Sequence, residues 1–149
     1  MVQTAIAEPE VRRARSERPI IAHRAAYDAF LVLYVGYVIL PVVAGIDKFF
    51  HFFANWDMYL APIVTQTSHL TATRFMDIVG VIEIAAGILV AIYPRIGAYV
   101  VALWLWGIVV NLLLIPGFYD IALRDFGLSL GALALARLSE RFPIVNEIS

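Results

Sequence analysis

The sequence predicts an all-α integral membrane protein, a four-helix bundle with both chain termini in the cytoplasm. Of its 149 residues, 62% are hydrophobic and only 15% are charged, and the mean hydropathy is +0.83. Typical soluble domains are about 45–50% apolar and about 25% charged. The apolar residues are also grouped, because residues 29–46 and 96–119 form runs of 18 and 24 residues without a charge. About 20 residues of helix cross the hydrocarbon core of a bilayer, so runs of this length are typical of membrane spans.

The chain begins with a polar segment, residues 1–22, that contains two prolines and four arginines. We expect a mobile cytoplasmic tail here, whose arginines act as a topology signal. The first span is predicted over residues 27–46. An aromatic segment follows over residues 47–62, where six Phe, Trp and Tyr residues lie among charged side chains. This mixture is typical of an interfacial segment at the level of the lipid headgroups.

Three further spans are predicted over residues 75–93, 96–115 and 118–138, which completes a bundle over residues 23–139. Pro94-Arg95 and Pro116-Gly117 provide the tight turns between them. The fourth span is the least apolar, because three charged residues, Asp120, Arg124 and Asp125, lie in its first third. Residues 140–149 are predicted to be a second cytoplasmic tail.

The distribution of Lys and Arg predicts the orientation in the cytoplasmic membrane. Eight of the 11 lie on the side of the two termini, and three lie on the opposite side. Loops rich in Lys and Arg stay in the cytoplasm, so both termini are expected there. Four spans agree with this arrangement.

The second predicted span contains a single carboxylate, Glu83, in an otherwise apolar stretch. A charged residue at the centre of a membrane helix costs about 2.5–3.5 kcal/mol on insertion scales, so Glu83 is expected to face inward with a partner. Gly80 and Gly87 share its helix face. In the fourth span, Arg124 shares a face with Gly127 and Gly131, and small residues let helices approach closely. We expect both faces to point into the bundle and Glu83 to pair with Arg124.

The predicted topology places the intramembrane polar residues in the outer half of the bundle. At 1.5 Å per residue, Glu83 lies roughly 12 Å below the outer end of its span, Arg124 roughly 9 Å and Asn111 roughly 6 Å. The candidate site is a polar pocket open to the outer face, and its residues are Glu83, Arg124, Asn111, Asp125, Asp47 and Lys48. Two interpretations stay open: the charged pair fixes helix register, or the pocket binds a ligand.

Several functions are excluded by the composition and the motifs. The absence of cysteine excludes disulfide chemistry, thiolate metal sites and thiol relays. The net charge of −1 implies no nucleic-acid partner. No P-loop, dinucleotide fingerprint, nucleophile elbow or HExxH pattern occurs, and neither a metal site nor a catalytic residue is predicted.

Four short stretches resemble the DoxX-like family of small four-span membrane proteins. They are the GIDKFF end of the first span (residues 45–50), the GxxExxxG pattern of the second (80–87), the PRIGAY turn (94–99) and the RD-initiated fourth span (124–137). The resemblance extends over residues 27–138 and leaves out the NWDMYLAP segment and the arginine-rich tail. It implies a place in a membrane oxidoreductase assembly, and Glu83 and Arg124 as recurrent polar positions without a catalytic role.

Three functions remain open, and the sequence does not decide whether the protein is an enzyme. The first is a non-catalytic subunit of a membrane oxidoreductase or oxidative-stress assembly, bound to a membrane or redox protein partner. The second is a quinone-associated subunit, with a quinone as a possible cofactor and Glu83 as proton donor or acceptor beside it. Mid-span Trp104 and Trp106 are favoured as packing residues over stacking on the quinone ring. The third is a small transporter or channel-like protein with a pocket open to the outer face.

Overall fold

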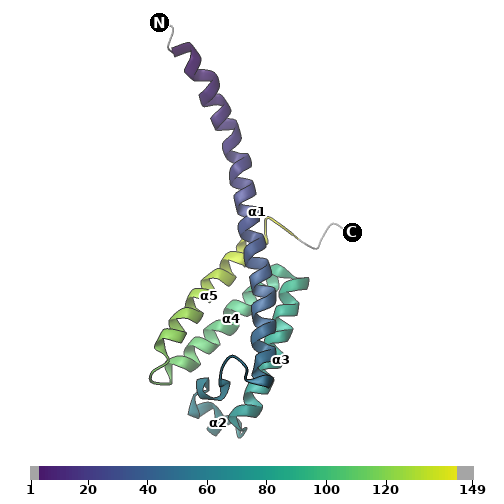
Figure 1. Ribbon diagram of the computed structural model, residues 1–149, viewed down its shortest axis with the longest axis vertical. Helices are drawn as coiled ribbons and strands as arrows, with labels where there is room; N and C mark the ends of the chain where they lie inside the picture. The colour runs from purple at the N-terminus through teal and green to yellow at the C-terminus, as the bar shows by residue number, and fades with distance from the viewer. Residues whose placement is uncertain (1–3, 144–149) are drawn as a thin grey trace.

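The described part of the chain is built from helices alone. The computed structural model describes residues 4–143, and the side chains of residues 20–143. Within this range no strand occurs. The elements are the α-helices α1 (Thr4–Phe50), α2 (Pro62–Ser68), α3 (Ala72–Ile92), α4 (Pro94–Leu113) and α5 (Tyr119–Leu138), and the 3-10 helix η1 (Trp56–Tyr59) (Figure 1).

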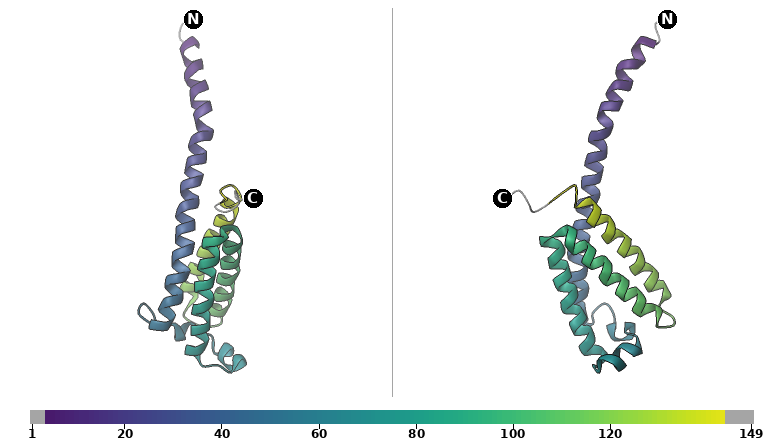
Figure 2. Two further views of the ribbon diagram at one scale, coloured as in Figure 1. Left: turned by 90° about the vertical axis from the view of Figure 1, so that its right-hand side faces the viewer. Right: turned by 180° about the vertical axis from the view of Figure 1, so that it is seen from behind.

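The four long helices pack in a closed order, which we call the helix ring. α1 packs against α3, α3 against α4, α4 against α5, and α5 returns to α1. The α3–α4 turn and the end of α5 lie at one end of the ring, while η1, α2 and the α4–α5 turn lie at the other (Figures 1 and 2). The short elements therefore gather at the end of the ring where α1 finishes.

The first helix is much longer than the predicted first span. α1 runs without a break through Pro19 and Pro41, and its N-terminal part projects beyond the other helices (Figure 1). Residues 4–22, predicted to be a tail, are helical, and their mobility stays a prediction. At the other terminus, Phe142 packs against Phe30 and Tyr27 of α1, with ring centroids 5.6 and 5.4 Å apart. Residues 144–149 of the second predicted tail lie outside the described residues.

Three helices of the described chain are long and apolar enough to cross a membrane. The segments are Ile20–Phe50 of α1, all of α3 and all of α4. They indicate a membrane protein embedded in a lipid bilayer, and many of their outward apolar side chains are exposed, as lipid contact requires. α5 is as long as α4 but contains four charged residues, Asp120, Arg124, Asp125 and Arg137. The fourth span therefore stays a prediction.

Close packing of α1 on α3 depends on glycines. A methyl group on Gly45 of α1 would lie 2.5 Å from the Gly80 carbonyl oxygen, and one on Gly80 would lie 2.7 Å from the Gly45 carbonyl oxygen. Gly87 of α3 meets Val42 of α1 in the same way, at 2.6 Å. Gly80, Glu83 and Gly87 are all buried, so the predicted inward face of this helix is confirmed.

The corresponding prediction for α5 is only partly correct. Gly131 faces Tyr37 of α1, with 2.5 Å between the Tyr37 hydroxyl and the position of a Cβ at Gly131. Gly127 is exposed, and a Cβ there would meet nothing within 4 Å. The helix turns this residue away because it packs on α1 and α4 through Ala122, Ser129, Ala132 and Leu135, which are buried.

We predict that Gly45→Ala lowers the free energy of unfolding by about 1–3 kcal/mol, the usual cost of overpacking. The added methyl group would press on backbone of α3, which cannot rotate away as a side chain can. Thermal unfolding in detergent measures the change. Gly36→Ala is the matched control in the same helix, since a Cβ there meets nothing within 4 Å. Equal melting temperatures for the two variants would contradict the close approach.

Candidate functional site

The centre of the candidate site is a buried ion pair between α1 and α3. Lys48 Nζ donates to Glu83 Oε2 over 2.6 Å, and the two side chains are only 5% and 9% exposed. The glycine contact described above brings the helices close enough for this pair, because Lys48 Cβ lies 3.2 Å from where a Cβ of Gly80 would be. A side chain at position 80 would occupy the path of Lys48.

The predicted partner of Glu83 is therefore wrong. Arg124 pairs with Asp120, one turn earlier in α5, with 3.4 Å between Nη2 and Oδ2. Its side chain is 75% exposed, so most of the guanidinium lies outside the protein interior. The physical reason is the order of the ring: α3 has α1 and α4 as its neighbours, and α5 lies across from it. Arg124 lies at a depth similar to that of Glu83, but on a helix that does not pack against α3.

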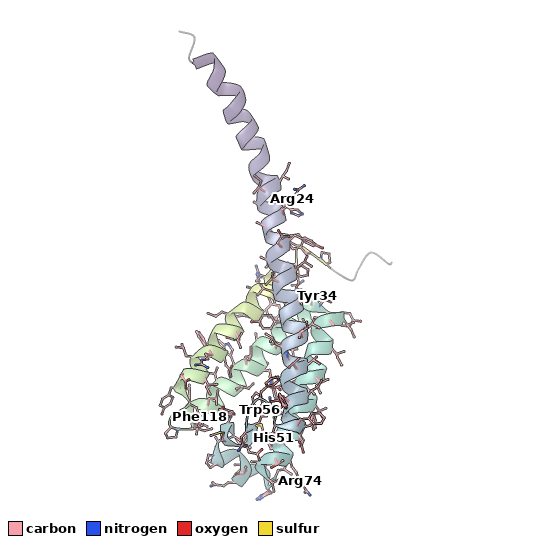
Figure 3. The ribbon with its side chains drawn as sticks, in the orientation of Figure 1. Arg24, Tyr34, His51, Trp56, Arg74 and Phe118 are labelled. Atoms are coloured by element: carbon pink, nitrogen blue, oxygen red, sulfur yellow. The ribbon has the colours of Figure 1, made fainter. Side chains whose placement is uncertain are left out.

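Trp56 covers the ammonium group of Lys48. Lys48 Nζ lies 3.9 Å from the centroid of the Trp56 ring, a cation–π distance. The indole N–H of Trp56 in turn donates to Asp47 Oδ2 over 2.8 Å. Trp56 lies at the end of α1, near His51 (Figure 3). Consecutive residues of α1 thus act on one ring: Lys48 by charge and Asp47 by hydrogen bonding.

Asp47 also shapes the loop after α1. The chain leaves the helix at His51, which has a positive φ of 53°. The Phe52 and Phe53 N–H groups then donate to Asp47 Oδ1 over 2.9 and 3.0 Å. Asp47 is only 3% exposed, so its charge is satisfied entirely by these donors and by Trp56. This carboxylate fixes the position of the aromatic ring rather than facing a ligand.

Asn111 of α4 holds the segment that follows. Its Nδ2 donates to the Tyr59 carbonyl over 2.6 Å, and its Oδ1 accepts from the Ala61 N–H over 2.9 Å. Asp57 of the same segment accepts from Thr73 of α3 over 2.7 Å. Residues 54–64, which we call the roof, are therefore bound to α1, α3 and α4. Tyr59 also packs on Phe118 of the α4–α5 turn, with centroids 5.1 Å apart, and Phe118 lies at this end of the molecule (Figure 3).

A cavity of about 620 Å³ lies beneath the roof and inside the helix ring. Its walls are mostly apolar, and five of the six candidate residues line it: Glu83, Arg124, Asn111, Asp125 and Lys48. The sixth, Asp47, lies behind Trp56 and does not line the cavity. That the pocket opens to the outer face stays a prediction; roof residues Trp56, Tyr59, Leu60 and Val64 are part of the lining.

Aromatic residues contribute much of the lining, and the sequence analysis did not place them there. They are Tyr37, Trp56, Tyr59, Phe75 and Trp104. For Trp104, the spacing of three, four and seven residues to Gly107, Ile108 and Asn111 could have indicated a shared helix face. Trp106 is different: its N–H donates to Ser129 of α5 over 3.1 Å, and it does not line the cavity.

Two polar groups that line this cavity lie close to the Glu83 carboxylate. The Trp104 indole N–H is buried and approaches this carboxylate, although the contact falls short of a full hydrogen bond. Asp125 lies within electrostatic range of both Glu83 and Lys48. A buried donor without an acceptor is costly and uncommon. The cavity therefore offers a donor, an ammonium group and carboxylates among mostly apolar lining residues.

The comparisons with known proteins return nothing for this chain: no protein family, no curated protein and no solved structure matches it. Within residues 20–143, no group of three or more His, Cys, Asp or Glu side chains is placed to hold a metal ion. The character of the site rests on its own geometry.

We predict that Glu83→Gln lowers the free energy of unfolding by about 3–5 kcal/mol, because it leaves the Lys48 ammonium buried without a counter-charge. Lys48→Met should lower the free energy of unfolding by a similar amount, because it leaves the Glu83 carboxylate buried without a counter-charge. The double variant Lys48→Met/Glu83→Leu should lose much less than the sum, which a double-mutant cycle on thermal unfolding in detergent measures.

The matched control for this cycle is the exposed pair of α5. Arg124→Gln breaks the contact with Asp120 and should change stability by only about 0–1 kcal/mol, as is typical of exposed ion pairs. Additive losses at Lys48 and Glu83, or a large loss at Arg124, would contradict this assignment of the buried pair.

Proposed function

We propose that this protein is a four-span protein of the cytoplasmic membrane that binds a quinone-type molecule in its cavity. Both termini lie in the cytoplasm, and the protein serves as a non-catalytic, quinone-associated subunit of a membrane oxidoreductase or oxidative-stress assembly. Membership of such an assembly rests on the resemblance to DoxX-like proteins. Binding in the cavity rests on the site itself.

The observation that supports binding is the cavity of about 620 Å³ with a few polar groups among its mostly apolar lining residues. Small-molecule sites are typically concavities of about 300–1,000 Å³ with apolar walls and a few convergent polar groups. A pair that only fixed helix register would be expected to pack tightly on all sides. Here Lys48 and Glu83 border open space instead.

The chemistry of the wall favours a flat ring that carries hydrogen-bond acceptors. The Lys48 ammonium has three donors and uses one on Glu83, and the Trp104 N–H makes no full hydrogen bond. Two carbonyl oxygens of a quinone accept such donors. The indole and phenol rings of Trp56, Trp104 and Tyr59 offer faces on which a quinone ring can stack.

Packing below the cavity favours binding over transport. Phe30, Val90, Ala98, Ala132 and Leu135 are at most 1% exposed and form one apolar core cluster at the end of the ring opposite the roof. An ion or polar solute passing between the two ends would have to cross this cluster, and burial of unpaired charge there is costly. A site closed at one end is suited to holding a ligand.

Four spans are proposed because α5 returns along α4 for its full length and packs between α4 and α1. Cysteine labelling tests this, since the chain has no cysteine of its own. Single cysteines at Thr67 and Pro116 should react with an impermeant maleimide from outside intact cells, and cysteines at Arg95 and Arg141 only after permeabilisation. Pro116→Cys and Arg141→Cys reacting from the same side would show that α5 does not cross the membrane.

Ligand binding is tested by quenching of tryptophan fluorescence with a benzoquinone in detergent. Trp56 and Trp104 line the cavity, and Trp106→Phe removes the tryptophan that does not. In that background, Gly107→Leu should weaken binding by about tenfold or more, equivalent to about 1.4 kcal/mol. Gly107 lines the cavity and a Cβ there meets nothing within 4 Å, so the added side chain starts in open space beside the site.

The matched control is Gly127→Leu, at a position with equally open surroundings outside the cavity. It should bind the benzoquinone like the parent protein. Quenching that does not saturate, or that the two leucine variants reduce equally, would contradict the cavity as the binding site. Native mass spectrometry of the mildly solubilised protein would then show whether it carries a protein partner alone.

A further inference from the structure

The junction between α1 and α5 differs from the other three junctions of the helix ring. The two helices meet at Tyr37, whose hydroxyl donates to the Leu128 carbonyl and touches Gly131. Their contact is the least extensive of the four neighbouring pairs. Beyond Tyr37, towards the roof, α1 and α5 diverge (Figures 1 and 2).

The other three junctions of the ring are held by close packing and hydrogen bonds. Gly45 and Gly80 bring α1 against α3, and at the end of the ring opposite the roof a Cβ on Gly97 of α4 would lie 2.5 Å from the backbone of Val90 of α3. Trp106 of α4 is hydrogen-bonded to Ser129 of α5. The roof is held on three helices by the hydrogen bonds of Asp47, Asn111 and Thr73.

Exposed lining residues identify the open side. Leu40 of α1 and Leu128 of α5 both line the cavity, yet they are 56% and 43% exposed. A residue that lines the cavity and is also exposed lies at the rim of the opening. Pro41, Ala44 and Ile121 continue the apolar lining beside them. Arg124 lines the same region with its stem, while its exposed head pairs with Asp120.

We propose that the gap between α1 and α5, which we call the lateral opening, leads from the cavity into the lipid bilayer, and that the ligand is a quinone with a polyprenyl tail. The ring lies at the wall of Lys48, Glu83 and Trp104, and the tail leaves between Leu40 and Leu128. This proposal rests on the proposed function and adds the class of quinone and its route.

Two physical facts select a tailed ligand over a water-soluble one. Leu40 lies within an apolar helix segment of membrane-spanning length, so the lateral opening faces hydrocarbon and not water. At the end of the ring nearest to the loops, the roof contributes Trp56, Tyr59, Leu60 and Val64 to the lining. A polyprenyl chain is far longer than a cavity of about 620 Å³ can hold, and its outer part gains by staying in lipid.

The experiment blocks the lateral opening with a bulky group. Leu40→Cys, in the cysteine-free chain with Trp106→Phe, is labelled with a large maleimide in detergent micelles. Quenching of Trp56 and Trp104 is then titrated with two ligands, a tailless benzoquinone and the same ring with a polyprenyl tail. Ile39→Cys carries the same label as the matched control, because Ile39 is 51% exposed and does not line the cavity.

At equilibrium, the label on Leu40→Cys is expected to weaken binding of the tailed quinone by about tenfold or more, because the tail must stay between Leu40 and Leu128. The tailless ring only passes this gap on its way in, so its affinity should fall by much less. The label on Ile39→Cys should change neither. Equal binding of the tailed quinone with and without the Leu40→Cys label would overturn the lateral opening and leave the proposed function standing. Failure of both quinones to bind the unlabelled protein would overturn the proposed function and this inference with it.

Discussion

The ion pair of Lys48 and Glu83 is the constraint on which the rest of the site depends. Two opposite charges in a low-dielectric interior attract strongly, but only if the helices approach closely enough for direct contact. Gly45 and Gly80 permit that approach, so the register of α1 on α3 and the ion pair determine one another. Once Lys48 is fixed, Trp56 has a cation to cover, and Asp47, one residue earlier, is placed to hold the Trp56 indole. The roof follows from these contacts.

The sequence predicts the positions of α3, α4 and α5 well, because each lies between prolines, glycines or polar segments, but it predicts neither the length of α1 nor the short helix α2. It also predicts that Glu83 faces inward, since a charge in a membrane helix requires a partner. It does not identify that partner. Positions along a helix give depth, but the partner depends on which helix faces Glu83, and this follows from glycine packing between α1 and α3. Arg124 had a suitable depth on a helix that lies across the ring.

The roof illustrates a second limit of sequence reasoning. Asn111 is tied to the Tyr59 carbonyl and the Ala61 N–H, which are backbone groups present at every residue and carry no sequence signal. Asp47 is similar, because two of its donors are backbone N–H groups of the loop after α1. The sequence shows that polar residues gather in the predicted outer half of the bundle. It does not show whether each polar side chain faces a ligand or forms hydrogen bonds within the chain. The structure separates them: Asp47 acts on the chain alone, whereas Lys48 and Glu83 border the cavity.

The low apolarity of α5 has a physical explanation in the same cavity. Asp125 lines it beside Glu83 and Lys48, and Arg124 lines it while extending outward to Asp120. A helix that faces an open polar wall on one side and its neighbours on the other need not be apolar throughout, even within a bilayer. Leu128 and Ile121 on the same helix keep the rim apolar where it meets α1. The distribution of charge along α5 thus follows the boundary of the cavity, with polar residues where a ring would bind and apolar residues where a tail would leave.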